Sequence, residues 1–324
     1  MTAPPGPEDT FHLRPVEWSD IRAVTDMLDA ASQHWVARPT TTAQVDDRLN
    51  TPDTDAARDT RCAVDENGTI IGFAHLWPTH PDVIRCFVRT HPAHRARGVG
   101  TALQDWVLER AAEIVTTASV EPARTVSTTS WPGDTDAEAL LAAAGYQAAR
   151  YYLAMVIDLS TDAPHPVPTP DGIVLRTFRD ADADALYAAY MESFAEHWGF
   201  EHPRPREWWG ERRDSDASGF DPTLWHVATD GEQIVGFAIA RTQTDADGVT
   251  HGYIGDLGVR PAWRGRRLGE ALLTRSLETL RERDIPYAKL DVDTENTSGA
   301  VRLYSKVGMQ PRPSFTIWEQ DLHP

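Results

Sequence analysis

The spacing of apolar residues along the chain alternates between the period of a strand and the period of a helix. Short apolar runs at 62–64 and 70–76 flank Asn67-Gly68, and similar runs at 225–228 and 234–240 flank Asp230-Gly231. Such a dipeptide between two apolar runs is typical of a two-residue hairpin turn. Each site therefore predicts an antiparallel hairpin.

Beyond the second hairpin the apolar positions change to helical spacing, at Leu272, Leu273, Leu277 and Leu280. A strand is predicted at 289–292, a helix at 300–307 and a last strand around 315–318. Each half of the chain then has the order β-α-β-β-β-α-β-α-β. This order favours an α+β (mixed α/β) fold, in which helices flank a mixed, mostly antiparallel sheet.

Five short segments of the first half return in the same order in the second half, which indicates a tandem duplication. The pairs are Leu13-Arg14 with Leu175-Arg176, His34-Trp35 with His197-Trp198, Gly72-Phe73-Ala74 with Gly236-Phe237-Ala238, 94–100 with 263–269, and Gly145 with Gly308. Between the copies, the proline-rich stretch 160–170 disfavours a helix. We predict a tail at 1–9, a first domain at 10–160, a linker at 161–171 and a second domain at 172–324.

Composition narrows the functional classes. The 324 residues carry 31 Lys and Arg against 49 Asp and Glu, a formal net charge of −18, which disfavours binding to nucleic acid and favours cationic small molecules. No apolar window is long enough for a membrane span and the start does not resemble a secretion signal, so we expect a cytoplasmic protein. Only Cys62 and Cys86 are present. A disulfide framework or a metal site is therefore not expected.

Two Arg/Gly-rich segments lie between a predicted strand and a predicted helix, Arg95-Ala96-Arg97-Gly98-Val99-Gly100 and Arg264-Gly265-Arg266-Arg267-Leu268-Gly269. The first amides of a helix have no partner within the helix, and the helix dipole adds positive potential. Glycine allows a ligand to approach the main chain closely. Each turn is therefore suited to hold a pyrophosphate.

These segments resemble the acetyl-CoA-binding motif Arg/Gln-x-x-Gly-x-Gly/Ala of the GNAT acetyltransferase superfamily. The first fits in full, and the second has Arg267 in place of the first glycine. The resemblance covers nearly the whole chain as two tandem GNAT folds. It implies that acetyl-CoA is the cosubstrate and that the chain is an acyltransferase. Among tandem GNAT proteins, the chain is most similar to mycothiol synthase-like actinobacterial proteins.

The resemblance also implies cofactor contacts. In the second copy these are Leu257, Val259, Arg264, Gly265, Arg266, Arg267, Leu268, Gly269 and Asn296, and in the first copy Arg95, Arg97, Gly98, Val99, Gly100 and Thr101. In GNAT enzymes the strand before the turn separates from its neighbour, and a main-chain N–H polarises the thioester carbonyl. Gly255 and Gly258 either permit a bulge in this strand or serve close packing.

Asp256 and Tyr304 are the main candidates for proton transfer. Asp256 lies on the strand beside the expected thioester, where it would deprotonate the attacking amine, only orient a cationic substrate, or face away. His251 and Tyr253 are weaker candidates. Tyr304 matches the tyrosine from which GNAT enzymes commonly protonate the departing CoA thiolate, whereas the first copy has Leu141 at this position. We therefore predict that catalysis belongs to the second copy.

The sequence leaves two interpretations open for the residues that would bind the acceptor. Glu196, His197 and Trp198 follow the first helix of the second copy and form either a pocket for a cationic amine or a solvated helix face. The predicted activity is direct transfer of acetyl from acetyl-CoA to a primary amine of a small molecule in a ternary complex. The alternatives are a catalytically silent acetyl-CoA-binding protein and an acetyltransferase of peptide or protein N-termini.

Overall fold

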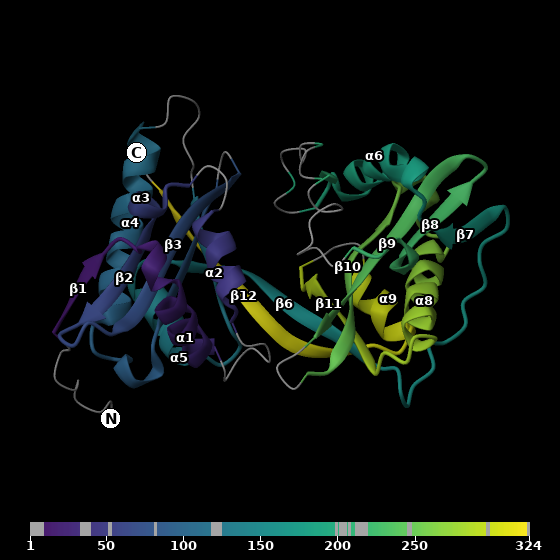
Figure 1. The fold of residues 1–324 in the computed structure, drawn as a ribbon. Helices are drawn as coiled ribbons and strands as arrows, with labels where there is room; N and C mark the ends of the chain where they lie inside the picture. Colours follow the sequence, from purple (N-terminus) through teal and green to yellow (C-terminus); the bar gives the residue numbers. More distant parts are fainter. Residues whose placement is uncertain are drawn as a thin grey trace. The chain divides into compact units, whose positions relative to one another are not determined.

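The computed structural model describes residues 10–32, 40–50, 54–80, 83–117, 125–197, 200, 206, 209–210, 220–244, 248–295 and 299–322. The predicted tail at 1–9 lies outside these residues. The chain forms two compact units, residues 1–151 with 315–324 (unit 1) and residues 152–314 (unit 2). Figure 1 shows that each unit is a twisted sheet flanked by helices.

Unit 1 contains a mixed sheet with the strand order β1-β2-β3-β4-β5-β12. All neighbouring strands are antiparallel except β4 and β5. The strands are β1 (Phe11–Arg14), β2 (Thr60–Asp65), β3 (Ile70–His80), β4 (Val83–Thr90), β5 (Thr125–Ser130) and β12 (Gln310–Asp321). The helices are α1 (Ile21–Ser32), α2 (Thr42–Leu49), α3 (Ala56–Asp59), α4 (Val99–Thr117) and α5 (Thr135–Ala143), with short 3₁₀ turns at Trp18–Asp20 and Pro92–His94.

Unit 2 repeats this plan with the strand order β7-β8-β9-β10-β11-β6. Only β10 and β11 run parallel. The strands are β6 (Gln147–Asp158), β7 (Ile173–Thr177), β8 (Trp225–Asp230), β9 (Gln233–Thr244), β10 (Thr250–Val259) and β11 (Tyr287–Asp293). The helices are α6 (Ala183–Phe194), α8 (Leu268–Arg281) and α9 (Ala300–Lys306), with 3₁₀ turns at Asp180–Asp182, Pro222–Leu224 and Pro261–Trp263.

The two copies exchange their last strands. β6 belongs to the first copy by sequence, but its residues 152–158 pair with β11 in unit 2. β12 belongs to the second copy, but its residues 316–321 pair with β5 in unit 1. The units of the structure therefore differ from the sequence copies 10–160 and 172–324 by this exchange.

Local features confirm the duplicated plan. Gly68 and Gly231 have positive φ (+80° and +57°) in the turns of the β2–β3 and β8–β9 hairpins. In unit 1, Arg14 donates two hydrogen bonds to Asp20 at 2.6 and 2.9 Å. In unit 2, Arg176 donates two to Asp182 at 2.6 and 2.8 Å. Both pairs tie the first strand of a unit to the turn before its first helix.

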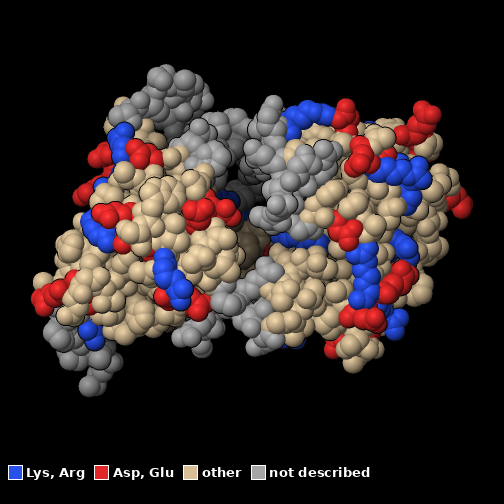
Figure 2. Space-filling model, in the orientation of Figure 1, with Lys and Arg blue, Asp and Glu red and all other residues tan. Residues whose placement is uncertain are grey.

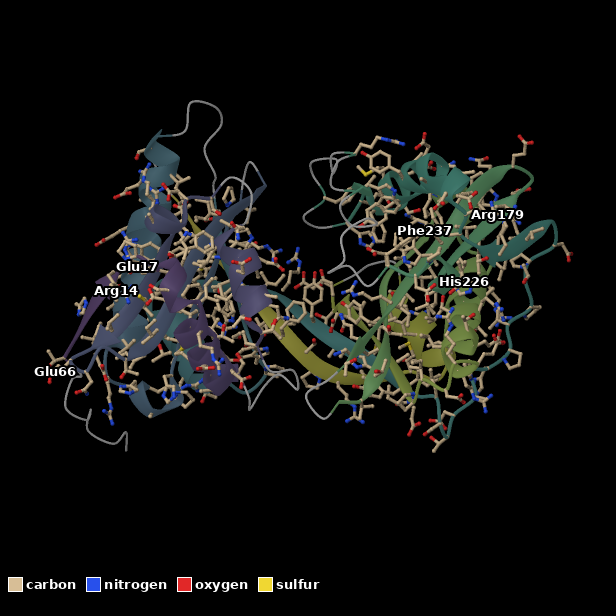
Figure 3. The ribbon with its side chains drawn as sticks, in the orientation of Figure 1. Arg14, Glu17, Glu66, Arg179, His226 and Phe237 are labelled. Atoms are coloured by element: carbon tan, nitrogen blue, oxygen red, sulfur yellow. The ribbon has the colours of Figure 1, made fainter. Side chains whose placement is uncertain are left out.

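The predicted fold class and hairpins are thus confirmed. The stretch 162–170 contains no helix or strand, in line with its four prolines. The cores lie on both faces of each sheet. In unit 1, α4 covers one face and α1 and α2 cover the other. In unit 2, α8 and α9 cover one face and α6 the other, where it packs on Phe237 of β9 (Figure 3).

Candidate functional site

Strand β10 has two irregularities that open its main chain. Its pairing with β9 shifts by one residue between Ile254 and Asp256, so Gly255 forms a bulge. Its pairing with β11 includes only Gly252 and Tyr253. From Ile254 onwards, the edge of β10 that faces β11 is therefore open to an extended ligand. The bulge predicted from the glycines of this strand is confirmed.

Gly258 serves close packing as well. A Cβ at this position would lie 2.3 Å from Cζ of Phe237, a fully buried ring. Phe237 in turn stacks on Tyr190 of α6, with the ring centroids 5.7 Å apart. The glycine thus lets an aromatic cluster approach the bulged strand. The cluster consists of Tyr190, Phe194, Phe200, Trp209 and Phe237.

Asp256, just after the bulge, is placed beside two tyrosines. The hydroxyl of Tyr190 donates a hydrogen bond to Oδ1 of Asp256 at 3.1 Å. Tyr304 extends from α9 and is buried. Burial, reinforced by the charge of Asp256, raises the pKa of Tyr304 to about 12. The structure therefore puts Tyr190 in contact with the carboxylate that the sequence indicated, and the charge of that carboxylate acts on the Tyr304 phenol.

The turn before α8 has the backbone of an anion site. Gly265 and Arg267 have φ of +77° and +62°. The first helical hydrogen bond of α8 runs from Ala271 N to Arg267 O at 3.1 Å. The amides of Leu268 and Gly269 therefore precede the helical bonding and have no acceptor within the helix. Arg267 keeps the left-handed conformation in spite of its side chain.

The side chain of Arg267 takes part in an ion cluster that sequence reasoning missed. Its Nε donates to Glu270 at 2.7 Å, and Nζ of Lys306 from α9 donates to the same carboxylate at 3.2 Å. Glu270 is only 6% exposed. Burial alone would raise the pKa of Glu270, but the bonds from the two cations hold that pKa below its ordinary value. The spacing of Arg267 and Glu270 was the available signal.

Glu196 and His197 lie against this turn. Arg264 donates to Glu196 at 2.9 Å and to the carbonyl oxygen of Ser193 at 3.0 Å. Burial, followed by the charge of Arg264, lowers the pKa of His197. The Glu196 carboxylate therefore links α6 to the turn through Arg264. Trp198 and Asn296 lie outside the described residues.

Two further candidates have other partners. Tyr253 donates its hydroxyl to Asp291 at 3.1 Å, and burial together with this carboxylate raises the pKa of Tyr253. His251 is buried and stacks on Tyr287, with 4.7 Å between ring centroids. His226 (Figure 3) contacts the hydroxyls of Ser276 and Thr279 and so joins β8 to α8. Asp256 remains the carboxylate beside the bulge.

The first copy lacks these groups at the corresponding positions. Phe87 pairs with His75 as Asp256 pairs with Ile239, and Arg89 pairs with Phe73 as Gly258 pairs with Phe237. From Ile84 to Thr90, β4 pairs with β3 without a β4 bulge, and Leu141 is buried on α5. Its turn nevertheless keeps the backbone, with Ala96 at φ +57° and Gly98 at φ +86°.

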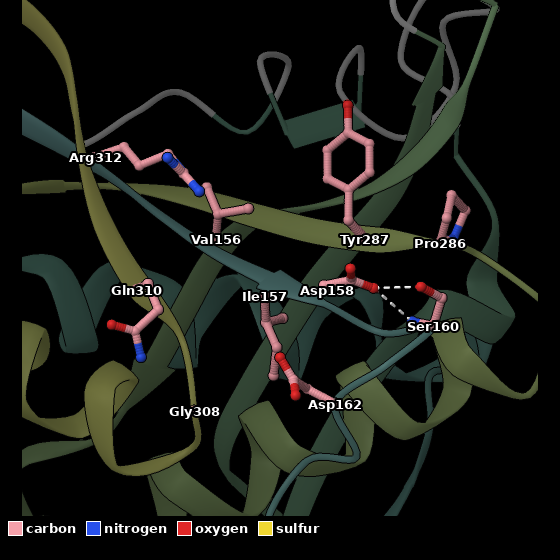
Figure 4. A pocket seen from close by; sticks show the side chains of 10 residues that line it. All are labelled: Val156, Ile157, Asp158, Ser160, Asp162, Pro286, Tyr287, Gly308, Gln310 and Arg312. Carbon is pink, nitrogen blue, oxygen red and sulfur yellow. Dashed lines mark hydrogen bonds between the residues drawn. The ribbon is translucent and has the colours of Figure 1, made fainter.

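Other features of the described residues do not coincide with this site. A cavity of about 300 Å³ lies in unit 2 at the ends of β6 and β11 (Figure 4), lined by residues that include Asp158, Ser160, Tyr287 and Arg312. Within the described residues, no three His, Cys, Asp or Glu are grouped to hold a metal ion, and no helix is long and apolar enough to cross a membrane. Acidic and basic side chains are interspersed on the face that Figure 2 shows.

Both copies of the chain match one family of known proteins. The model of the acetyltransferase (GNAT) family matches residues 24–127 and 183–309, one stretch in each copy. The mycothiol acetyltransferase of Thermobispora bispora is 34% identical over 261 residues, which are 78% of this chain and 79% of the relative. The mycothiol acetyltransferase of Nocardia farcinica is 32% identical over 297 residues, 89% of this chain and 90% of the relative.

Solved structures show the same architecture. A GCN5-related N-acetyltransferase from Sphaerobacter thermophilus has a TM-score of 0.74 at 27% identity and covers 98% of both chains. A tandem GNAT protein from the clavulanic acid biosynthesis pathway has a TM-score of 0.71 at 19% identity, covering 97% of this chain and 99% of that one, a likeness of fold alone. Two matched copies and relatives that align along most of their length leave one conclusion. The chain belongs to the GNAT family of acetyl-CoA-dependent acetyltransferases.

Proposed function

We propose that this acetyltransferase moves acetyl from acetyl-CoA to a primary amine of a small molecule, and that the second copy performs the transfer. One observation carries the proposal. On the bulged strand of unit 2, Asp256 accepts a hydrogen bond from Tyr190, and its charge acts on Tyr304, whereas unit 1 has Phe87 and Leu141 in place of Asp256 and Tyr304.

The residues of unit 2 suit acetyl-CoA. Acetyl-CoA supplies the activated thioester. The open edge of β10 at Leu257–Val259 offers main-chain groups to the pantetheine arm, and the turn at 264–269 offers its amides to the pyrophosphate. Gly269 lets α8 start against Leu303, since a Cβ there would lie 3.0 Å from Cδ1 of that leucine. Asn296 would add a contact to the pantetheine arm.

Asp256 would act as the general base for the amine or attract its positive charge. A primary ammonium has a pKa of about 10.4, so almost all of it is protonated at neutral pH. The Asp256 carboxylate, held by the Tyr190 hydroxyl, would accept one proton directly or through a water molecule. The same negative charge, beside an aromatic cluster, attracts a cationic acceptor. Either role places the acceptor on the α6 side of the sheet.

Tyr304 would act as the general acid for the leaving group. Its pKa of about 12 keeps the phenol protonated throughout the physiological range. Among the described residues, none exchanges a hydrogen bond with the Tyr304 hydroxyl, which leaves it available to a ligand. The hydroxyl would donate its proton to the departing CoA thiolate.

The comparisons suggest where to look for the acceptor. The relatives in Thermobispora bispora and Nocardia farcinica are named mycothiol acetyltransferases. The free-amine form of the mycothiol scaffold is therefore the first acceptor to test. Amino sugars and short peptides with free N-termini complete the panel, because they separate a small-amine acceptor from a protein N-terminus.

The decisive experiment measures CoA release with this panel and compares wild type with Tyr304→Phe. We expect turnover to fall about 100-fold or more, the usual contribution of a general acid, while the Kd for acetyl-CoA is unchanged. Tyr151→Phe, at a 53% exposed tyrosine of unit 1, is the control. Unchanged turnover would exclude Tyr304 from the mechanism. If acetyl-CoA binds but no acceptor of the panel gives CoA release, the protein is a silent binding protein, and release with peptides alone would favour N-terminal acetylation.

A further inference from the structure

Arg89 of unit 1 places a cation where unit 2 has a glycine. In unit 2 the same register position holds Gly258, beside the bulge and the aromatic cluster. In unit 1, β4 and β5 pair only from Val83 to Arg85, so Arg89 lies where the two strands have separated. Its side chain therefore stands in the part of unit 1 that corresponds to the transfer site of unit 2.

Aromatic rings hold the guanidinium there. Its Cζ lies 4.2 Å from the ring centroid of Phe87 on β4 and 4.2 Å from that of Trp131, the residue after β5. Arg89 thus reaches from one separated strand to the other. Contacts of this kind use the faces of a guanidinium and leave the N–H groups at its edge for other partners.

Those edge groups are poorly satisfied. Nη1 donates to the carbonyl oxygen of Val88 at 2.7 Å, whereas the buried Nε has no hydrogen-bond partner among the described residues. Among the described residues, no carboxylate lies within ion-pair distance of Arg89. The nearby Asp134 already pairs with Arg95 at 3.4 Å and caps α5 through the amide of Ala137. A half-buried cation whose Nε is buried and that has no carboxylate nearby is costly, and a bound anion would relieve that cost.

The surroundings add positive charge and a second unsatisfied group. Arg48 of α2 stacks on Phe87 at 4.1 Å. Burial, with the charge of Arg48 as the next cause, lowers the pKa of Arg89 to about 10, so Arg89 remains charged at neutral pH. His75 pairs with Phe87 across β3 and β4, which places its side chain on the same face of the sheet. It is 1% exposed, and within the part of the chain that the structure describes neither ring nitrogen has a hydrogen-bond partner.

The phosphate turn of unit 1 approaches this cation. Gly98 keeps its positive φ, and the first helical bond of α4 runs from Ala102 N to Gly98 O at 3.0 Å, as in unit 2. The charge of Arg95, at the start of the turn, is close enough to influence Arg89. A CoA thioester held by this turn would therefore extend its acyl group toward Arg89.

We propose that unit 1 is a binding site for a CoA thioester whose acyl group ends in a carboxylate, and that Arg89 recognises that carboxylate. The planar fork of a guanidinium matches a carboxylate with two parallel hydrogen bonds. The aromatic contacts with Phe87 and Trp131 fix the plane of the fork in advance. Because Leu141 and Phe87 replace the acid and the base, unit 1 binds such a thioester without turning it over. This inference does not depend on which acceptor unit 2 uses.

The test compares the binding of CoA, acetyl-CoA and succinyl-CoA to the whole protein by titration calorimetry, with native mass spectrometry to count bound copies. We expect one site to prefer succinyl-CoA over acetyl-CoA by about 10- to 100-fold, the usual value of a hydrogen-bonded charge. Arg89→Met should abolish this preference and leave the affinity for CoA unchanged. Gly98→Asp, which puts a negative charge in the turn, should abolish it as well. Arg89→Lys, which keeps the charge but loses the fork, should retain only part of it.

Several results would overturn the proposal. Equal affinities for the three ligands would do so. Tighter acetyl-CoA binding by Arg89→Met would show that Arg89 merely blocks the site, and a preference that persists in Gly98→Asp would belong to unit 2. Thermal melts guard against a misfolded variant, because Arg89→Met removes a half-buried charge that has no carboxylate partner among the described residues and should melt no lower than wild type. None of these outcomes alters CoA release by unit 2, which is measured separately with acetyl-CoA.

Discussion

The left-handed conformation of Arg267 leads to a prediction that separates backbone strain from ion pairing. A non-glycine residue at φ +62° carries a strain of about 1–2 kcal/mol, which glycine does not. Glycine in turn costs about 0.5–1 kcal/mol more backbone entropy on folding than alanine. Arg267→Ala and Arg267→Gly both lose the bond to Glu270, so this loss cancels when the two are compared. Arg267→Gly should therefore be more stable than Arg267→Ala by about 0.5–1 kcal/mol.

Comparison with wild type then gives the value of the ion pair. Arg267 is 59% exposed at its side chain, and Glu270 keeps its bond to Lys306 when Arg267 is removed. The pair with a partly exposed arginine contributes about 1 kcal/mol at most. Arg267→Gly should thus unfold close to wild type, because the relief of strain offsets the lost pair. Arg267→Ala should be less stable than wild type by about 1 kcal/mol.

The assay is reversible urea unfolding, with thermal melts as a second measure. For a unit of this size, 1 kcal/mol corresponds to a shift of about 2–4 °C in Tm. Gly265→Ala is the matched control, because a Cβ there meets no atom within 4 Å and its cost is strain at φ +77° alone. In unit 1 the glycine occupies the other position, so Ala96→Gly should stabilise and Gly98→Ala destabilise. Equal midpoints for Arg267→Gly and Arg267→Ala would refute the reasoning.

Three further outcomes are expected. Gly258→Ala should destabilise unit 2 by about 1–3 kcal/mol and lower turnover, because its Cβ would press on the buried ring of Phe237. Urea unfolding and CoA release measure these two effects, and wild-type values in both assays would contradict the prediction. Leu141→Tyr should add no CoA release, since unit 1 has Phe87 as the counterpart of Asp256; any gain in a Tyr304→Phe background would show otherwise. Burial, followed by the charges of nearby arginines, lowers the pKa of His226 to about 4, below its unfolded value of about 6.5. The free energy of unfolding should therefore fall by up to about 3 kcal/mol as the pH drops from 6.5 to 4. His226→Gln should make the urea midpoints less dependent on pH in this window, and an unchanged pH dependence would show that the histidine plays no part.

Much of the fold could be predicted because local patterns determined it. The hairpins at Gly68 and Gly231 followed from turn residues that accept positive φ, and the helices followed from apolar spacing. The strand exchange could not be predicted. β6 and β12 are the last strands of their copies, and nothing in the apolar pattern of a strand states which neighbouring edge it will join.

The site likewise has features that the sequence predicted and features that it could not. The bulge at Gly255 could be predicted because glycine in a strand tolerates an irregular ladder. The bond from Tyr190 to Asp256 joins residues 66 positions apart and depends on how α6 packs on the sheet. Glu196 was grouped with an acceptor pocket from its neighbours in sequence, and only the folded chain shows its pairing with Arg264. Sequence spacing thus located the chemistry that lies within one element, and packing decided the contacts between elements.

The exchanged strands affect how this chain reaches its native state during synthesis. Strand β5 of unit 1 is complete once residue 130 has emerged from the ribosome, but its partner in β12 ends at Asp321. The β5 edge consequently has no native partner while the whole second copy is being made. Cleavage within 162–170 would leave each fragment without the strand that completes its sheet. Each unit of this duplication thus contains a strand that the other copy encodes, so neither sheet is complete until both copies have been synthesised.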